Sequence, residues 1–172
     1  MSAPDYLAYH DQEWGRPVRS VNGLYERLTL EAFQSGLSWI TILRKRPAFR
    51  TAFASFVPAA VASFDQSDVD RLMADADIVR NRAKIDAALH NARVIADLDA
   101  ELPRLIWSFH DPDRPRPSRL GEVPATTPES VALSRALKAV GIRFVGPTTA
   151  YALMQAVGVV DDHLDDCFVE PR

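Results

Sequence analysis

The spacing of apolar residues constrains the fold of this chain more than any other feature. Apolar residues recur at helical intervals through almost the whole sequence, and no stretch alternates apolar and polar residues as a half-buried strand would. The clearest stripe lies in the alanine-rich stretch 81–102, where Ile85, Leu89, Ile95 and Leu98 share one face. These patterns predict a mostly α-helical protein with a long central helix.

Capping signals suggest where the early helices begin. Asn22 is a candidate N-cap for a helix that ends near residue 35. Ser67 with Asp70 resembles a capping box for a helix that runs through Met73. Both signals are local, so we expect them to indicate where the helices lie but not their exact first residues.

A proline-rich and charged segment divides the second half of the chain. Between His110 and Pro128 the prolines remove backbone donors, so we expect a surface loop that joins two lobes. Thr127 then caps a helix whose first residue is Pro128, and Gly141 ends that helix.

Composition sets broad bounds on the class of protein. With 172 residues and 47% hydrophobic content, we expect one globular domain, or two small lobes that share a core. No apolar run reaches the roughly 18 residues needed to span a bilayer, and the first residues lack a signal-peptide pattern. We therefore expect a cytoplasmic protein with no membrane partner. Cys167 is the single cysteine, which excludes an internal disulfide.

The net charge argues against a broadly basic surface that would bind nucleic acid nonspecifically. The net charge is −3, yet the basic residues cluster near positions 44–50, 80–84 and 135–143. These clusters leave two alternatives open, which are a local nucleic-acid face and ordinary solvated helix faces.

The two ends of the chain hold its most specialised side chains. Aromatic and metal-ligand residue types concentrate in the first fifteen and last ten positions, although termini are usually the least ordered part of a domain. We therefore expect the fold to bring the ends together near a working site. The residues concerned are Tyr6, Tyr9, His10, Trp14, His163 and Cys167.

A glycine-closed turn lies between the last two predicted helices. Gly146 would let the backbone approach a partner, and the free amides at Thr148 and Thr149 favour an anion such as a DNA phosphate. A plain connection between helices explains the local pattern equally well. The element covers residues about 131–158 and resembles a helix-hairpin-helix, which favours the phosphate.

Glu31 falls on the apolar face of its predicted helix, three and seven residues after Leu28 and Leu24. A carboxylate there must pair with an arginine, turn to solvent or line a pocket. With Trp39 and the amino-terminal aromatics nearby, an aromatic pocket with one acceptor becomes a competitive alternative. Such a pocket suits a flat cationic ring.

Four separated motifs occur in order along nearly the whole chain. They are Tyr9-His10-Asp11-Gln12-Glu13-Trp14-Gly15, Leu30-Glu31-Ala32-Phe33-Gln34-Ser35-Gly36-Leu37-Ser38-Trp39-Ile40, Phe144-Val145-Gly146, and Asp162-His163 with Cys167. Together they resemble the motifs of the bacterial DNA-3-methyladenine glycosylase I family. The resemblance implies an all-α helix-hairpin-helix glycosylase fold for residues 1–172, with two helical lobes and joined ends. It also implies an enzyme that flips 3-methyladenine out of double-stranded DNA and hydrolyses its glycosidic bond.

The same resemblance assigns roles to individual residues. Glu31 would hydrogen-bond the adenine, Trp39 and Tyr9 would stack on its ring, and Tyr6 and Trp14 would complete the wall. Gly36 and Leu37 resemble the plug that fills the gap left in the DNA stack, although Leu37 suits a core position as well. Gly146, Thr148 and Thr149 would contact the DNA backbone.

The family also implies a structural zinc held by two cysteines and two histidines. This sequence supplies His10, His163 and Cys167, and it has no cysteine before Tyr6. Because structural zinc sites nearly always have four protein ligands, we expect zinc to be absent.

Asp161 departs from the family pattern, since related helix-hairpin-helix glycosylases place an essential aspartate near this position. It is a candidate to stabilise the sugar cation, but membership of a solvated acidic run that includes Asp162, Asp165 and Asp166 is favoured. The competing class of function is a noncatalytic helix-hairpin-helix module that binds DNA or an aromatic cation. We expect a monomer, because one flipped base needs one pocket.

Overall fold

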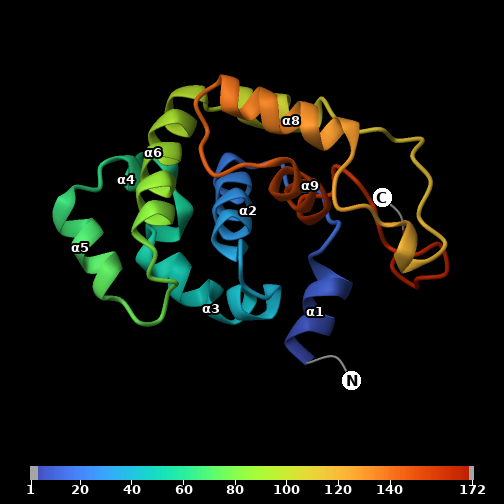
Figure 1. Ribbon diagram of the computed structural model, residues 1–172, viewed down its shortest axis with the longest axis horizontal. Helices are drawn as coiled ribbons and strands as arrows, with labels where there is room; N and C mark the ends of the chain where they lie inside the picture. The colour runs from blue at the N-terminus through green and yellow to red at the C-terminus, as the bar shows by residue number, and fades with distance from the viewer. Residues whose placement is uncertain (1–3, 171–172) are drawn as a thin grey trace.

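The computed structural model describes residues 4–170, and among these it contains helices and loops but no strand (Figure 1). This confirms the predicted helical class. No helix in the described range is long and apolar enough to cross a membrane. The helices are α1 (Pro4–Gln12), α2 (Val21–Gln34), α3 (Trp39–Ala52), α4 (Pro58–Ala62), α5 (Gln66–Ala74), α6 (Arg82–Leu98), α7 (Glu101–Trp107), α8 (Pro128–Ala139) and α9 (Pro147–Ala156), with the 3₁₀ turns η1 (Ala54–Phe56) and η2 (Leu120–Glu122).

Helix α2 lies at the centre of the fold (Figure 1). It contacts α3, α4, α6, α7 and α9, and every residue from Leu24 to Phe33 is buried. Because neighbours surround this helix, its polar positions are buried together with its apolar ones. This central placement brings Glu31 into the interior.

The other helices form two groups on either side of α2. Helices α3, α4, α5 and α6 lie on one side, where α6 packs against α4 and α5. Helices α8 and α9 pack against each other on the opposite side. The segment that joins α7 to α8 is an exposed loop interrupted only by η2, as its prolines predicted.

Two helix caps differ from the prediction. Ser20, rather than Asn22, caps α2 by accepting a backbone N–H three residues ahead. Asp65, rather than Ser67, caps α5 and forms a capping box with Asp68. In both cases another short oxygen-bearing side chain lies two residues before the predicted cap, and propensity alone did not separate the two positions.

The long helix predicted over residues 81–102 is two helices. Helix α6 ends at Leu98 because Asp99 adopts a φ of 42°, which interrupts the helical backbone, and α7 begins two residues later. The start of α8 follows the prediction, with Thr127 as its cap and Pro128 as its first residue.

The segment after α1 is packed against the carboxyl end of α9. The Gly15 N–H donates to the Gln155 carbonyl (3.1 Å) and the Val18 N–H donates to the Val157 carbonyl (3.0 Å). At Gly158 (φ 77°) an added Cβ would lie 2.7 Å from the Gly15 carbonyl oxygen, so this approach requires glycine. The two ends of the described chain therefore meet, as predicted.

The turn between α8 and α9 is fixed by side chains from the protein interior. The Ser134 hydroxyl donates to the Val145 carbonyl (2.8 Å). The Asn91 amide donates to the Arg143 carbonyl (3.0 Å) and accepts from the Arg143 N–H (2.8 Å). Helix α6 thus sets the position of the hairpin relative to the central core.

Candidate active site

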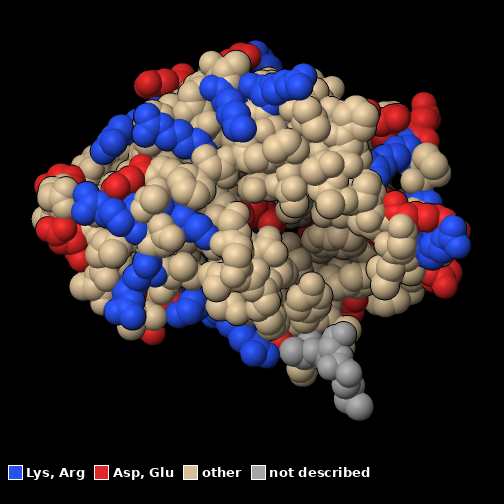
Figure 2. All heavy atoms as spheres, in the orientation of Figure 1, with Lys and Arg blue, Asp and Glu red and all other residues tan. Residues whose placement is uncertain are grey.

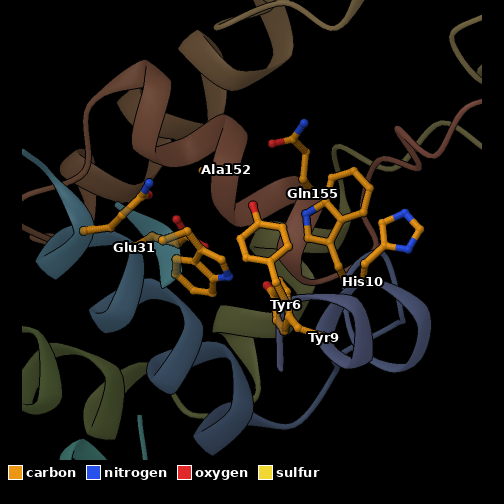
Figure 3. Close-up of a pocket in the computed structure, with 9 residues that line it drawn as sticks. Tyr6, Tyr9, His10, Glu31, Ala152 and Gln155 are labelled. Carbon is orange, nitrogen blue, oxygen red and sulfur yellow. The ribbon is translucent and has the colours of Figure 1, made fainter. Parts of the chain in front are cut away.

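Residues on and beside α1, α2, α3 and α9 line a cavity of about 270 Å³ (Figure 3). This volume is near the lower end of the range for ligand pockets, roughly 300–1,000 Å³. Figure 2 shows a hollow in the surface between α2 and α9, with acidic atoms visible inside it. The lining residues are Tyr6, Tyr9, His10, Trp14, Glu31, Gln34, Trp39, Ala152 and Gln155.

Glu31 supplies the carboxylate of this cavity. Its exposed fraction is 6%, and its carboxylate forms no ion pair with any described residue from 4 to 170. Burial raises the pKa of Glu31 from 4.5 to about 8, and the positive charge of Arg27, one turn earlier on α2, acts in the opposite direction. At neutral pH this carboxyl is therefore mostly protonated, and a cation bound in the cavity would favour its ionised form.

Tyr9 and Trp39 form aromatic walls of the same cavity. Their ring centroids are 5.3 Å apart and their planes are inclined at 45°. Tyr9 is 5% exposed, and burial, followed by the charge of Glu31, raises the pKa of its phenol so that it stays neutral. Tyr6, from the preceding turn of α1, is 41% exposed and lies toward solvent. Together these rings give the cavity the electron-rich faces that attract a flat cation.

The indole N–H of Trp39 is buried and has no acceptor among residues 4–170. A buried donor without an acceptor costs about 1–3 kcal/mol. Trp39 is the first residue of α3, so the start of that helix fixes where the indole lies. The cavity wall therefore combines this unsatisfied indole donor with the buried carboxyl of Glu31.

The sequence analysis did not identify three of the lining residues, which are Gln34, Ala152 and Gln155. Gln34 follows Glu31 by three residues on α2, so helical spacing could have placed both on one face. Ala152 and Gln155 come from α9, and no local signal connects that helix with α2. His10 was expected to be a metal ligand, and it also lines this cavity.

The methyladenine glycosylase family model matches residues 1–170, nearly the full chain. The chain belongs to the methyladenine glycosylase family. It is 44% identical to DNA-3-methyladenine glycosylase 1 of Escherichia coli, over 98% of this chain and 92% of that protein. It is 43% identical to DNA-3-methyladenine glycosylase of Haemophilus influenzae, over 94% and 90% of the two chains.

Solved structures of 3-methyladenine DNA glycosylase I share the fold. One crystal structure has a TM-score of 0.94 at 41% identity and covers 99% of this chain and 97% of its own. A variant crystallised in complex with 3-methyladenine has a TM-score of 0.92 at 32% identity, with coverages of 100% and 95%. These likenesses confirm the expected glycosylase fold.

An ion-pair network that the sequence did not reveal lies behind the aromatic wall. Glu13 accepts two hydrogen bonds from Arg46 (2.6 and 2.7 Å) and one from Arg27 (3.0 Å). Arg27 also pairs with Glu26 (2.9 Å), which in turn binds Arg50. The network joins the segment after α1 to α2 and α3, and it holds the cation that acts on Glu31.

The three zinc-ligand candidates line a second cavity of about 250 Å³. The rings of His10 and His163 are 4.9 Å apart, and the Nδ1 atom of each is hydrogen-bonded to an aspartate, Asp11 (2.8 Å) or Asp161 (2.7 Å), an arrangement that histidine ligands of metals also adopt. No group of three or more His, Cys, Asp or Glu residues between 4 and 170 is arranged to hold a metal ion. With Cys167, the described residues do not fit the closed zinc site that the family implies.

The acidic run near the carboxyl end is only partly solvated. Asp161 lies outside the aromatic cavity and pairs with Arg116 (2.7 Å). Burial alone would raise the pKa of Asp161, but its hydrogen bonds with His163 and Arg116 outweigh burial and lower it. Asp162 is 4% exposed, so its expected place in a solvated run is wrong. Asp165 and Asp166 are exposed, as expected.

The remaining predicted positions lie outside the cavity lining. Gly36 (φ 83°) and Leu37, which is 40% exposed, form the turn between α2 and α3. Gly146 caps α9, and a Cβ built there would have no atom within 4 Å, so the backbone is open to a partner. Thr148 is exposed and Thr149 is half-buried in the first turn of that helix.

Proposed function

We propose that this protein is a monofunctional DNA glycosylase that flips 3-methyladenine out of alkylated duplex DNA and hydrolyses its N-glycosidic bond. The observation that carries the proposal is the Glu31 carboxyl, buried without an ion pair in an aromatic cavity. A buried carboxyl of this kind is unfavourable unless a ligand supplies positive charge or donors. 3-Methyladenine in DNA carries a positive charge and an exocyclic amine.

Charge and ring stacking together recognise the base. The ionised Glu31 carboxylate accepts a hydrogen bond from the exocyclic amine and lies beside the cationic ring, while Trp39 and Tyr9 stack on that ring. Tyr6 and Trp14 complete the wall. Unmethylated adenine is neutral, so it gains little from the carboxylate and binds more weakly.

The chemistry follows from the charge of the base. When the C1′–N9 bond breaks, its electron pair returns to the purine, which leaves as the neutral base, and positive charge develops on the sugar. Water then forms a bond to C1′ and releases a proton to solvent, which leaves an abasic site. Because N3 methylation has already made the purine a good leaving group, the site needs no strong general acid.

DNA is held by elements outside the cavity. Leu37, with Gly36, enters the stack where the base has left, and an exposed leucine in a fixed turn is suited to that place. The amides at the start of α9, near Gly146, Thr148 and Thr149, bind a backbone phosphate. Lys and Arg side chains gather over α6 and α8 on the face that carries the hollow, which favours a polyanion (Figure 2).

Further properties belong to the same proposal. Residues 1–172 form one glycosylase domain that acts as a monomer in the cytoplasm. Zinc is not bound, because His10, His163 and Cys167 supply three of the four ligands that a structural site needs, and no metal-holding group of ligand-type residues is arranged within residues 4–170. The ends meet instead through backbone hydrogen bonds of Gly15 and Val18 to the end of α9 and through the Arg16 guanidinium, which donates to the Glu170 carbonyl (3.5 Å).

Release of free base from methylated duplex DNA, measured by chromatography, tests the proposal. The wild-type protein is expected to release 3-methyladenine, and Trp39→Ala should lower the rate by at least about 10-fold through lost stacking. Leu120→Ala, an exposed change far along the chain, is the matched control. A protein that binds methylated DNA but releases no base would be the noncatalytic module instead.

A further inference from the structure

Asp162 is a buried carboxylate surrounded by donors, although it does not line the aromatic cavity. Its side chain is 1% exposed. It accepts hydrogen bonds from Arg114 Nη2 (2.9 Å), the Tyr151 hydroxyl (2.6 Å) and Gln155 Nε2 (2.8 Å). A carboxylate satisfied by three donors holds each of them in a fixed place. Of these three donors only Gln155 also lines the cavity.

The bond to Asp162 fixes which end of the Gln155 amide the cavity meets. An ionised carboxylate only accepts hydrogen bonds, so the NH₂ end of the amide must face it. The carbonyl oxygen is then the end left for the cavity. In Figure 3 the oxygen of Gln155 is turned toward the side that holds Glu31, and the nitrogen is turned away. Gln155 therefore presents a fixed neutral acceptor.

We propose that Gln155 Oε1 orients the water that attacks the sugar, an inference that rests on the glycosylase function proposed above. Glu31, on α2, already accepts from the base, whereas Gln155 comes from α9 across the cavity. One hydrogen of the water donates to Oε1, which directs an oxygen lone pair at C1′. The C1′–O bond forms, the C1′–N9 pair leaves with the purine, and the water proton passes to solvent.

An amide is too weakly basic to keep that proton, so the contribution of Gln155 is orientation alone. Displacing a reactant by about an ångström can lower a reaction rate about 10²-fold, so loss of this orientation should lower the rate by about that factor. Asp162 acts only through Gln155 and is a positioning residue. This separates Asp162 from Asp161, whose carboxylate is directed to Arg116 and His163.

Gln155→Met tests the inference because methionine preserves length and removes the acceptor. Single-turnover release of 3-methyladenine from methylated duplex DNA should fall about 10²-fold. Affinity for free 3-methyladenine, followed by tryptophan fluorescence, should change by less than about 2-fold, because a water-orienting group does not touch the base. Gln66→Met, an exposed change on α5, is the matched control.

Two results would overturn the inference. An unchanged single-turnover rate would show that no water depends on Gln155, and an equal loss of free-base affinity would show that Gln155 binds the base. If Gln155→Met does not fold, Gln155→Asn takes its place in the test. Its side chain is one methylene shorter, which moves the amide oxygen away from the water, so the rate should still fall at least about 10-fold. A wild-type protein that releases no base would instead reject the glycosylase function itself.

Discussion

Replacing Glu31 by glutamine should stabilise the ligand-free protein at alkaline pH. The carboxyl has a pKa of 4.5 when exposed and about 8 in the folded protein, because burial disfavours its charge. Between these values the folded protein binds a proton that the unfolded chain has lost. Stability of the wild type therefore falls as pH rises from 4.5 to about 8, and the glutamine variant lacks this loss.

The magnitude follows from the separation of the two pKa values. At about 1.4 kcal/mol for each pH unit between them, the variant gains up to roughly 5 kcal/mol above pH 8 and almost nothing near pH 4.5. For a domain of this size, 1 kcal/mol corresponds to about 2–4 °C in the melting temperature. The variant should therefore melt up to roughly 10–20 °C higher than the wild type at alkaline pH.

Thermal unfolding followed by circular dichroism across this pH range is the assay. Glu101→Gln is the matched control, because Glu101 is exposed and, among residues 4–170, its carboxylate pairs with Arg104 on the surface. The difference in melting temperature between this control and the wild type should stay constant across the pH range. Equal melting temperatures for wild type and Glu31→Gln at every pH would refute the reasoning, because they would mean that the fold does not penalise the Glu31 charge.

Three further predictions concern the surroundings of the cavity. Arg27→Met removes the cation that lowers the pKa of Glu31, so the pH at which kcat/KM for base release reaches its plateau should move upward in a pH titration. Leu37→Ala should lower release from duplex DNA about 10-fold while free-base affinity stays unchanged, since the leucine acts on the stack rather than on the base; an equal loss of both would contradict the plug. Metal analysis with and without chelator should find less than one zinc per chain, and stoichiometric zinc bound through His10, His163 and Cys167 would contradict the expected absence.

The fold was predictable because its signals are local. Apolar periodicity established the helical class, and Thr127 with Pro128 marked the start of α8. The break after Leu98 was not predictable, because Asp99 adopts a positive φ in a stretch whose composition favours a continuous helix. Tertiary packing of α7 against α2 and α6 decides that break.

The cavity was only partly predictable. Glu31 and the aromatics stood out because a carboxylate on an apolar helix face is unusual. Gln155 and Glu13 did not, because their importance depends on tertiary contacts: Gln155 reaches the cavity from α9, and Glu13 pairs with Arg46, 33 residues away. The burial of Asp162 was missed because its acidic neighbours in sequence suggested solvent, whereas its partner Arg114 is 48 residues away.

The pH dependence of kcat/KM for release of 3-methyladenine from methylated duplex DNA tests the central claim most directly. If an ionised Glu31 binds the cationic base, the wild-type value should rise with pH and level off above about 8. Glu31→Gln should be lower by about 10-fold or more and should not follow this rise, because a charge-assisted hydrogen bond of about 1.5–3 kcal/mol is lost. Equal values for the two proteins across the range would contradict the claim that a buried carboxylate recognises the alkylated purine.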